Sequence, residues 1–182
     1  MVREYIYFAG SLPMLFFGSA MPMSVAQFDE NAAHLLDEAT AELLRQATLY
    51  APEQEALPEN VRKFYDFETA LRNSALDFRK KYRPDAADFK RGNPDFYSEI
   101  TPALTQAAGC ADLLEAEKII DRLRWNAAES LTVGHYADLT MLALYRIRLQ
   151  ILEKYLVRNA ENGNQALEKI LNTLLNENAA KN

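Results

Sequence analysis

Residues 58–82 read PENVRKFYDFETALRNSALDFRKKY, and this stretch decides the fold. Its apolar residues recur every three or four positions, which is the period of one face of an α-helix. That face carries Val61, Phe64, Tyr65, Glu68, Leu71, Arg72, Ala75, Leu76 and Arg79. Pro58 suits the first turn of a helix, and Pro84 stops one. The stretch therefore predicts a single long helix from residue 58 to about residue 82.

The same period predicts further helices on both sides of this one. Ser24 with Gln27 and Asp112 with Glu115 have the spacing of capping boxes, in which side chains bind the free N–H groups of a helix start. The helices expected are 24–36, 37–50, 96–108 with an interruption at Pro102, 112–131, 136–159 and 165–175. We predict an all-α fold, an antiparallel bundle of long helices with shorter helices packed across an end.

The chain length fits one domain. Its 182 residues predict a single helical domain over 1–182, with two helical halves, 1–83 and 94–176, joined by a loop at 84–93 as the alternative. Residues 177–182 form a polar tail. The 49% hydrophobic content is enough for a core without metal or disulfides.

The charge and the cysteine content exclude several classes of partner. A formal charge of -6 disfavours nucleic acid, which needs clustered Lys and Arg. The single Cys110 cannot form an internal disulfide, so a reducing cytoplasm is expected.

The apolar stretch 5–17 is too short to span a bilayer, which takes about 20 residues. Gly18-Ser19-Ala20 after it leaves a cleaved signal peptide as the alternative to a buried first element.

Catalytic and metal-binding patterns are weak. Cys110 and His135 are the one pair suited to a thiol nucleophile and its base, and they define a hydrolase hypothesis. No glycine-rich phosphate loop, zinc spacing or nucleophile elbow occurs in the sequence. The acidic residues Asp112, Glu115, Glu117 and Asp121 lack the Glu-x-x-His partners of a bundle metal site. We expect Asp112 and Glu115 to serve the helix start and Asp121 to pair with Arg124. No catalytic residue, cofactor or metal is predicted.

Several residues are candidates for protein contacts. Trp125 follows Arg122 and Arg124 in the sequence, and Trp and Arg dominate interface hot spots, but a plain core Trp is the favoured alternative. Arg146, Arg148, Lys154 and Arg158 predict a basic, solvated helix face. Arg146 and Arg148 join the interaction candidates, as do Tyr5 and Tyr7. Glu68 and Arg72 have the spacing of a helix ion pair, and we expect a structural polar clasp.

Five stretches together resemble one bacterial family. They are YIYFAGSLPML at 5–15, SVAQF at 24–28, FETALRN at 67–73, LEAEK followed by DRLRW at 114–125, and LYRIRLQILE at 144–153. The family is of unknown function and is encoded within V-type (V/A-type) ATPase operons, at the position of the C/d subunit. The similarity spans roughly residues 5–160.

The resemblance implies a role. In these ATPases the C/d subunit is the helical adaptor that joins the rotor shaft to the membrane ring. By analogy, this chain is expected to be a non-enzymatic subunit or assembly factor whose partners are other subunits of the shaft or ring. It would be cytoplasmic, peripheral to a membrane complex and without a span of its own. The alternative is an exported, stand-alone helical binding protein.

Overall fold

The computed structural model describes residues 2–50, 56–81, 83, 85 and 89–157. In these residues the regular secondary structure is entirely α-helical. The elements are α1 (Val2–Ser11), α2 (Val25–Leu35), α3 (Glu38–Gln46), α4 (Glu59–Lys80), α5 (Ile100–Ala108), α6 (Leu113–Leu131) and α7 (Leu139–Val157). The all-α prediction is confirmed. The expected helix at 165–175 and the tail lie outside the described residues.

Short polar side chains set the starts of three helices, two of them at the predicted capping residues Ser24 and Asp112. Ser24 and Gln27 form the complete capping box of α2. Asp37 accepts a hydrogen bond from the N–H of Thr40 at the start of α3. Asp112 caps α6 through the N–H of Leu114, 3.0 Å away, in place of a box with Glu115. Each cap satisfies a backbone N–H that has no partner inside the helix.

Two predicted helices differ from those observed. α3 ends at Gln46 and not at residue 50, because α7 side chains bind the backbone beyond it. Arg146 and Gln150 donate to the carbonyl of Ala47, and Gln150 accepts from the N–H of Leu49 at 2.7 Å. α5 begins at Ile100, and Pro102 lies in its first turn without interrupting it. A first-turn residue needs no N–H donor, so proline is tolerated there.

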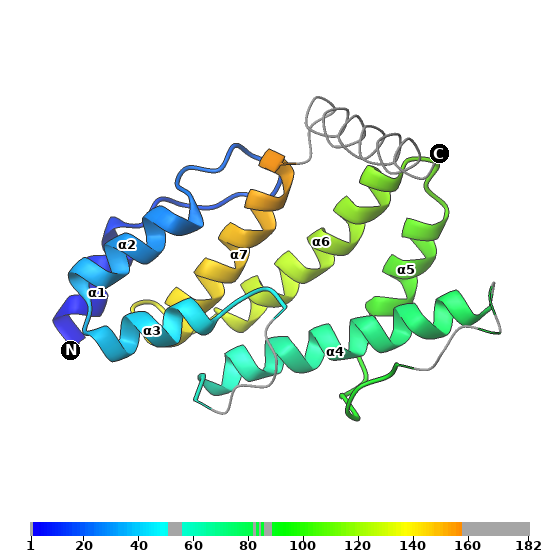
Figure 1. Ribbon diagram of the computed structural model, residues 1–182, viewed down its shortest axis with the longest axis horizontal. Coiled ribbons are helices and arrows are strands. Elements are labelled where there is room, and N and C mark those ends of the chain that lie inside the picture. Colours follow the sequence, from blue (N-terminus) through cyan, green and yellow to red (C-terminus); the bar gives the residue numbers. More distant parts are fainter. Residues whose placement is uncertain (1, 51–55, 82, 84, 86–88, 158–182) are drawn as a thin grey trace, which may run out of the picture.

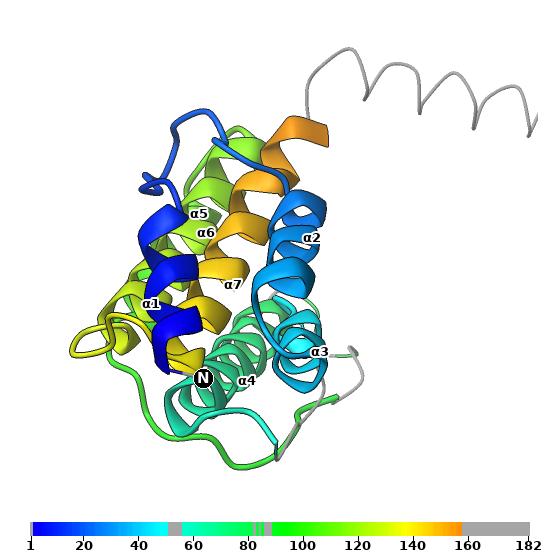
Figure 2. The same cartoon turned by 90° about the vertical axis from the view of Figure 1, so that its left-hand side faces the viewer.

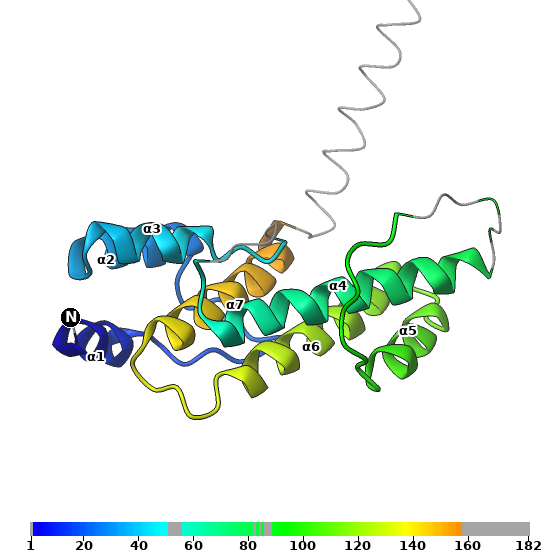
Figure 3. The same ribbon diagram turned by 90° about the horizontal axis from the view of Figure 1, so that it is seen from below.

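The helices pack around α7. α6 and α7 run antiparallel side by side, and both contact α4 (Figure 1). At one end of the molecule α7 lies between α1 and α2 (Figure 2). Seen from below, α4 extends past α6 to the side where α5 packs (Figure 3). No helix of the described residues is both long enough and apolar enough to cross a membrane.

The core centres on α7, which is apolar on nearly every side. Its fully buried side chains are Leu142, Ala143, Leu144, Ile147, Leu149 and Ile151. A helix that is hydrophobic all round belongs in an interior, and here α2, α3, α4 and α6 cover it. The main core joins residues from both sides of 84–93, and a smaller core forms between α4, α5 and α6.

The apolar N-terminal stretch is part of this core. Phe8 and Leu15 are buried, and the Tyr145 hydroxyl donates to the carbonyl of Pro13 at 2.7 Å. Phe28 lies between the rings of Phe8 and Tyr145, with centroid distances of 5.2 Å and 5.7 Å. Residues 5–17 thus contribute Phe8 and Leu15 to the core, whereas Ile6, Tyr7, Met14 and Phe16 are exposed.

Candidate functional site

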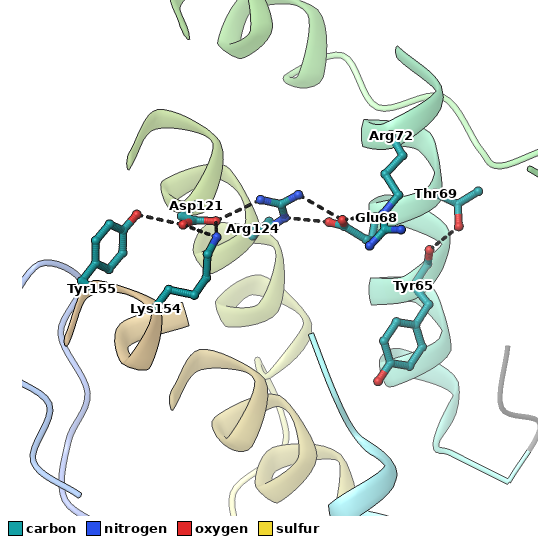
Figure 4. Close-up of polar contacts among 8 residues, drawn as sticks. All are labelled: Tyr65, Glu68, Thr69, Arg72, Asp121, Arg124, Lys154 and Tyr155. Atoms are coloured by element: carbon teal, nitrogen blue, oxygen red, sulfur yellow. Dashed lines mark hydrogen bonds and ion pairs between the residues drawn. The ribbon is translucent and has the colours of Figure 1, made fainter. Parts of the chain in front are cut away.

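A row of charged side chains crosses the interior from α4 through α6 to α7 (Figure 4). Its two carboxylates are buried, Glu68 at 4% exposure and Asp121 at 0%. The Arg124 guanidinium lies between them. It donates to the two carboxylate oxygens of Glu68 at 2.8 Å and 3.0 Å, and to Asp121 Oδ1 at 2.9 Å. We call Glu68, Arg124 and Asp121, together with Arg72, Lys154 and Tyr155 at the two ends, the charged row.

Each end of the charged row has further partners. Arg72 Nε donates to Glu68 Oε1 at 2.9 Å, so the predicted polar clasp of Glu68 and Arg72 is present. Lys154 Nζ lies 2.7 Å and 2.6 Å from the two Asp121 oxygens, and the Tyr155 hydroxyl donates to Oδ2 at 2.8 Å. Three cations therefore neutralise two carboxylates, and the row ties α4, α6 and α7 together.

Burial makes this pairing necessary. An ion removed from water loses its hydration, and only close opposite charges and hydrogen bonds offset that cost. Burial lowers the pKa of the Arg124 guanidinium, but its hydrogen bonds to Glu68 and the charge of that residue outweigh burial and hold the pKa above its usual range. Burial, then the hydrogen bond to Asp121, raises the pKa of the Tyr155 hydroxyl. The Arg124 guanidinium therefore stays a cation and the Tyr155 hydroxyl stays protonated, which suits a structural role better than proton transfer.

The hypothesis of a Cys/His pair is wrong. Cys110 precedes α6 and His135 follows it, and a helix of 19 residues separates them by roughly 28 Å. His135 Nδ1 contacts Asp138 Oδ2, and Nε2 lies 3.0 Å from Asn60 Nδ2. The Cys110 thiol instead faces the carbonyl of Gln106. Neither side chain is positioned to activate the other.

The predicted acidic group divides between two tasks. Asp112 caps α6, whereas Asp121 pairs with Arg124 as expected. Among the residues that the structure describes, no three His, Cys, Asp or Glu side chains gather in a way that would hold a metal ion. Of the predicted acidic group, Asp112 therefore serves the start of α6 and Asp121 the charged row.

Trp125 is a core residue and not a docking point. It is 3% exposed, and its ring meets Phe17 edge-on at 5.7 Å between centroids. The Arg148 guanidinium lies 5.4 Å from its ring centre. Of the two alternatives for Trp125, the core position is confirmed and the interface position is wrong, because Phe17 and Arg148 cover the ring.

The predicted basic face of α7 is also wrong. Arg146 is 6% exposed and binds both oxygens of Asp29 on α2, each at 2.7 Å. Arg148 lies mostly inside, 3.7 Å from Glu129, and burial lowers the pKa of its guanidinium. Lys154 belongs to the charged row, and Arg158 lies outside the described residues. Arg146 and Lys154 point inward to acidic partners, whereas Arg148 packs against the Trp125 ring, so Arg146 and Arg148 present no docking surface.

Two of the predicted interaction residues remain on the surface. Arg122 is exposed and its guanidinium lies 4.0 Å above the Phe17 ring. Tyr7 is 67% exposed on α1. Tyr5 is half-buried, with its hydroxyl 3.1 Å from Thr40 Oγ1, and Arg124 is committed to the charged row. Of the predicted interaction residues, Arg122 and Tyr7 are thus the ones whose side chains are exposed.

Sequence reasoning missed the long-range acidic partners. Asp29 pairs with Arg146 across 117 positions of the chain, and Asp121 pairs with Lys154 across 33. Only one signal pointed to them: Arg146, Gln150 and Lys154 recur every four positions on an otherwise apolar helix.

No family model, curated protein or solved structure matches this chain.

Proposed function

We propose that this protein is a non-enzymatic subunit or assembly factor of a bacterial V/A-type ATPase, similar in role to the C/d subunit. It would hold shaft and membrane-ring components together through helical surfaces. Its place would be cytoplasmic, peripheral to the membrane complex. In this proposal α4, α6 and α7 act as an antiparallel bundle, and shorter helices pack across an end.

The main support for the proposal is that the five stretches that resemble the ATPase-operon family contact one another in the structure. Phe28 of the second stretch packs on Phe8 of the first and on Tyr145 of the fifth. Glu68 of the third is bound by Arg124 of the fourth. Residues that contact one another define a fold jointly, so their combined resemblance supports a shared structure more than five separate matches would.

The interior supports a mechanical role. The charged row and the Arg146–Asp29 pair fix α2, α4, α6 and α7 to one another through buried, directional contacts. Such contacts resist sliding, because a displaced helix leaves buried charges without partners. A body held in this way transmits force between two docking surfaces, which is what an adaptor between shaft and ring requires.

Affinity purification from native membranes tests the proposal. A tagged chain should retain shaft or ring subunits of the ATPase after gentle detergent extraction. Arg122→Glu and Tyr7→Ser, each on an exposed surface, should reduce that recovery, while Arg62→Glu on the exposed side of α4 should not. Absence of the protein from an intact, purified ATPase complex contradicts the proposal.

A further inference from the structure

A pocket of about 330 Å³ lies along α4. One wall is the stripe from Tyr65 to Arg79 on that helix, the Tyr50 ring lies 4.9 Å from the Arg72 guanidinium, and Phe89 and Arg91 form part of the rim. The segment that carries Phe89 and Arg91 returns along α4 before α5 begins (Figure 3). We call this cavity the arginine pocket.

The arginine pocket is cationic although the whole chain is acidic. Arg72, Arg79 and Arg91 line it, and Glu68 is the acidic residue among the described lining. That carboxylate is already saturated by Arg72 and Arg124. In the described part of the chain, Arg79 and Arg91 form no ion pair. The pocket therefore offers guanidinium donors to an anion, in a chain whose net charge is -6.

The rim that carries Arg91 is fixed. The Asn73 side-chain amide donates to the Arg91 carbonyl at 2.8 Å and accepts from the Arg91 N–H at 3.0 Å. Gly92 follows with a φ of 53°, a conformation that favours glycine. A site held open in advance loses less entropy when it binds a ligand. The arginine pocket is thus formed before any ligand arrives.

The shape of the arginine pocket indicates which kind of polypeptide segment it can bind. The stripe from Tyr65 to Arg79 spans about 20 Å of helix, so a pocket of about 330 Å³ along it is long and narrow. Such a groove suits an extended chain better than a helix, which with its side chains is about 10 Å across.

The spacing of the arginines matches one extended conformation. Arg72 and Arg79 are seven residues apart, about 10 Å along the axis of α4, with Leu76 between them. In polyproline II, residues i and i+3 share a face and lie about 9 Å apart. Carboxylates at those two positions would meet both guanidiniums, which bind carboxylates with two parallel hydrogen bonds.

We propose that the arginine pocket binds an extended acidic segment of a partner protein. Two carboxylates three residues apart contact Arg72 and Arg79, with Arg91 closing over one of them, and an apolar side chain between them packs on Leu76 and Phe89. Arg79 and Arg91 are the specificity-determining residues, because Arg72 also holds Glu68 in place. This inference does not depend on the ATPase assignment.

Fluorescence anisotropy with short labelled peptides tests the proposal. The probe contains the sequence Glu-Pro-Leu-Glu. The control peptides carry Gln-Pro-Leu-Gln, or the same residues with the two Glu adjacent. The full-length chain should bind the probe, and both controls should bind at least about tenfold more weakly, since each charged hydrogen bond contributes that much. Added salt should weaken binding.

Matched protein variants locate the binding. Arg79→Gln with Arg91→Gln should weaken the probe about tenfold or more, whereas Arg62→Gln, a charge loss elsewhere on α4, should leave binding unchanged. Far-UV circular dichroism verifies that each variant is folded. The proposal is overturned if the probe does not bind, if the Gln peptide binds equally well, or if Arg62→Gln weakens binding equally. Competition by inorganic phosphate at the same concentration as the peptide also overturns it, since the pocket would then accept any small anion.

Discussion

Replacement of Arg124 by methionine is the sharpest test of the charged row. The change removes three hydrogen bonds of 2.8 Å, 3.0 Å and 2.9 Å and keeps an unbranched side chain as far as the ε position. Glu68, 4% exposed, keeps only its contact with Arg72. Removing one partner of a buried pair costs about 3–5 kcal/mol. Since a domain of this kind is stable by only about 5–15 kcal/mol, Arg124→Met should remove a large share of the unfolding free energy.

Urea unfolding followed by far-UV circular dichroism and by Trp125 fluorescence measures this loss. With a slope near 2 kcal/mol per molar urea, the midpoint should fall by about 2 M. Arg122→Met is the matched control: it lies two residues earlier on α6, is exposed, and should cost about 1 kcal/mol or less through its contact with Phe17. The double variant Glu68→Met with Arg124→Met should lose less unfolding free energy than the two single variants lose together, by about 1–3 kcal/mol. An equal loss of unfolding free energy in the two arginine variants would refute the reasoning, because removing Arg124 would then cost no more than removing an exposed arginine.

Three further outcomes follow from the same interior. Asp29→Asn leaves the buried Arg146 without its carboxylate and should lower the unfolding free energy by about 3 kcal/mol, measured by urea unfolding; a change below about 1 kcal/mol contradicts the pairing. Phe8→Ala should cost about 3–5 kcal/mol, and deletion of residues 2–17 should abolish cooperative thermal unfolding, because the main core loses its first element. Burial raises the pKa of the Tyr145 hydroxyl to about 12, so its contribution to stability is complete below about pH 10 and is lost as the pH rises through about 12. Tyrosinate absorbance should show one fewer late-titrating group in Tyr145→Phe than in the unchanged chain, since Tyr65, Tyr97 and Tyr155 also have raised pKa values.

Local chemistry explains why most helices were predictable. Ser24, Asp37 and Asp112 mark helix starts because their short side chains bind N–H groups two or three residues away, so the signal and its effect lie together in the sequence. α4 and α6 were located by the period of their apolar residues, to within a residue or two at most ends. The end of α3 was not predictable in this way. It depends on Arg146 and Gln150, which lie about 100 positions later in the chain.

The candidate site was harder to predict, because its partners are distant. The local pairs Glu68–Arg72 and Asp121–Arg124 were expected and are present, since both lie within one turn of a helix. The contact that joins them, from Arg124 to Glu68, spans 56 positions and has no local signal. Charged residues on a helix are normally solvated, and that general rule placed Arg146 and Arg148 on the wrong side of α7.

The polar residues of α7 show what periodicity can and cannot decide. Arg146, Gln150 and Lys154 form one stripe along the helix, and the spacing alone reveals it. Whether the stripe faces water or the interior depends on what lies opposite. Here each member is satisfied inside, by Asp29, by the backbone after α3 and by Asp121. A slide of α7 by one turn would keep its apolar residues buried but would separate both cations from their carboxylates, at about 3–5 kcal/mol for each broken pair. Hydrophobic burial therefore keeps α7 in the centre of the fold, and the inward stripe fixes its position along its own axis.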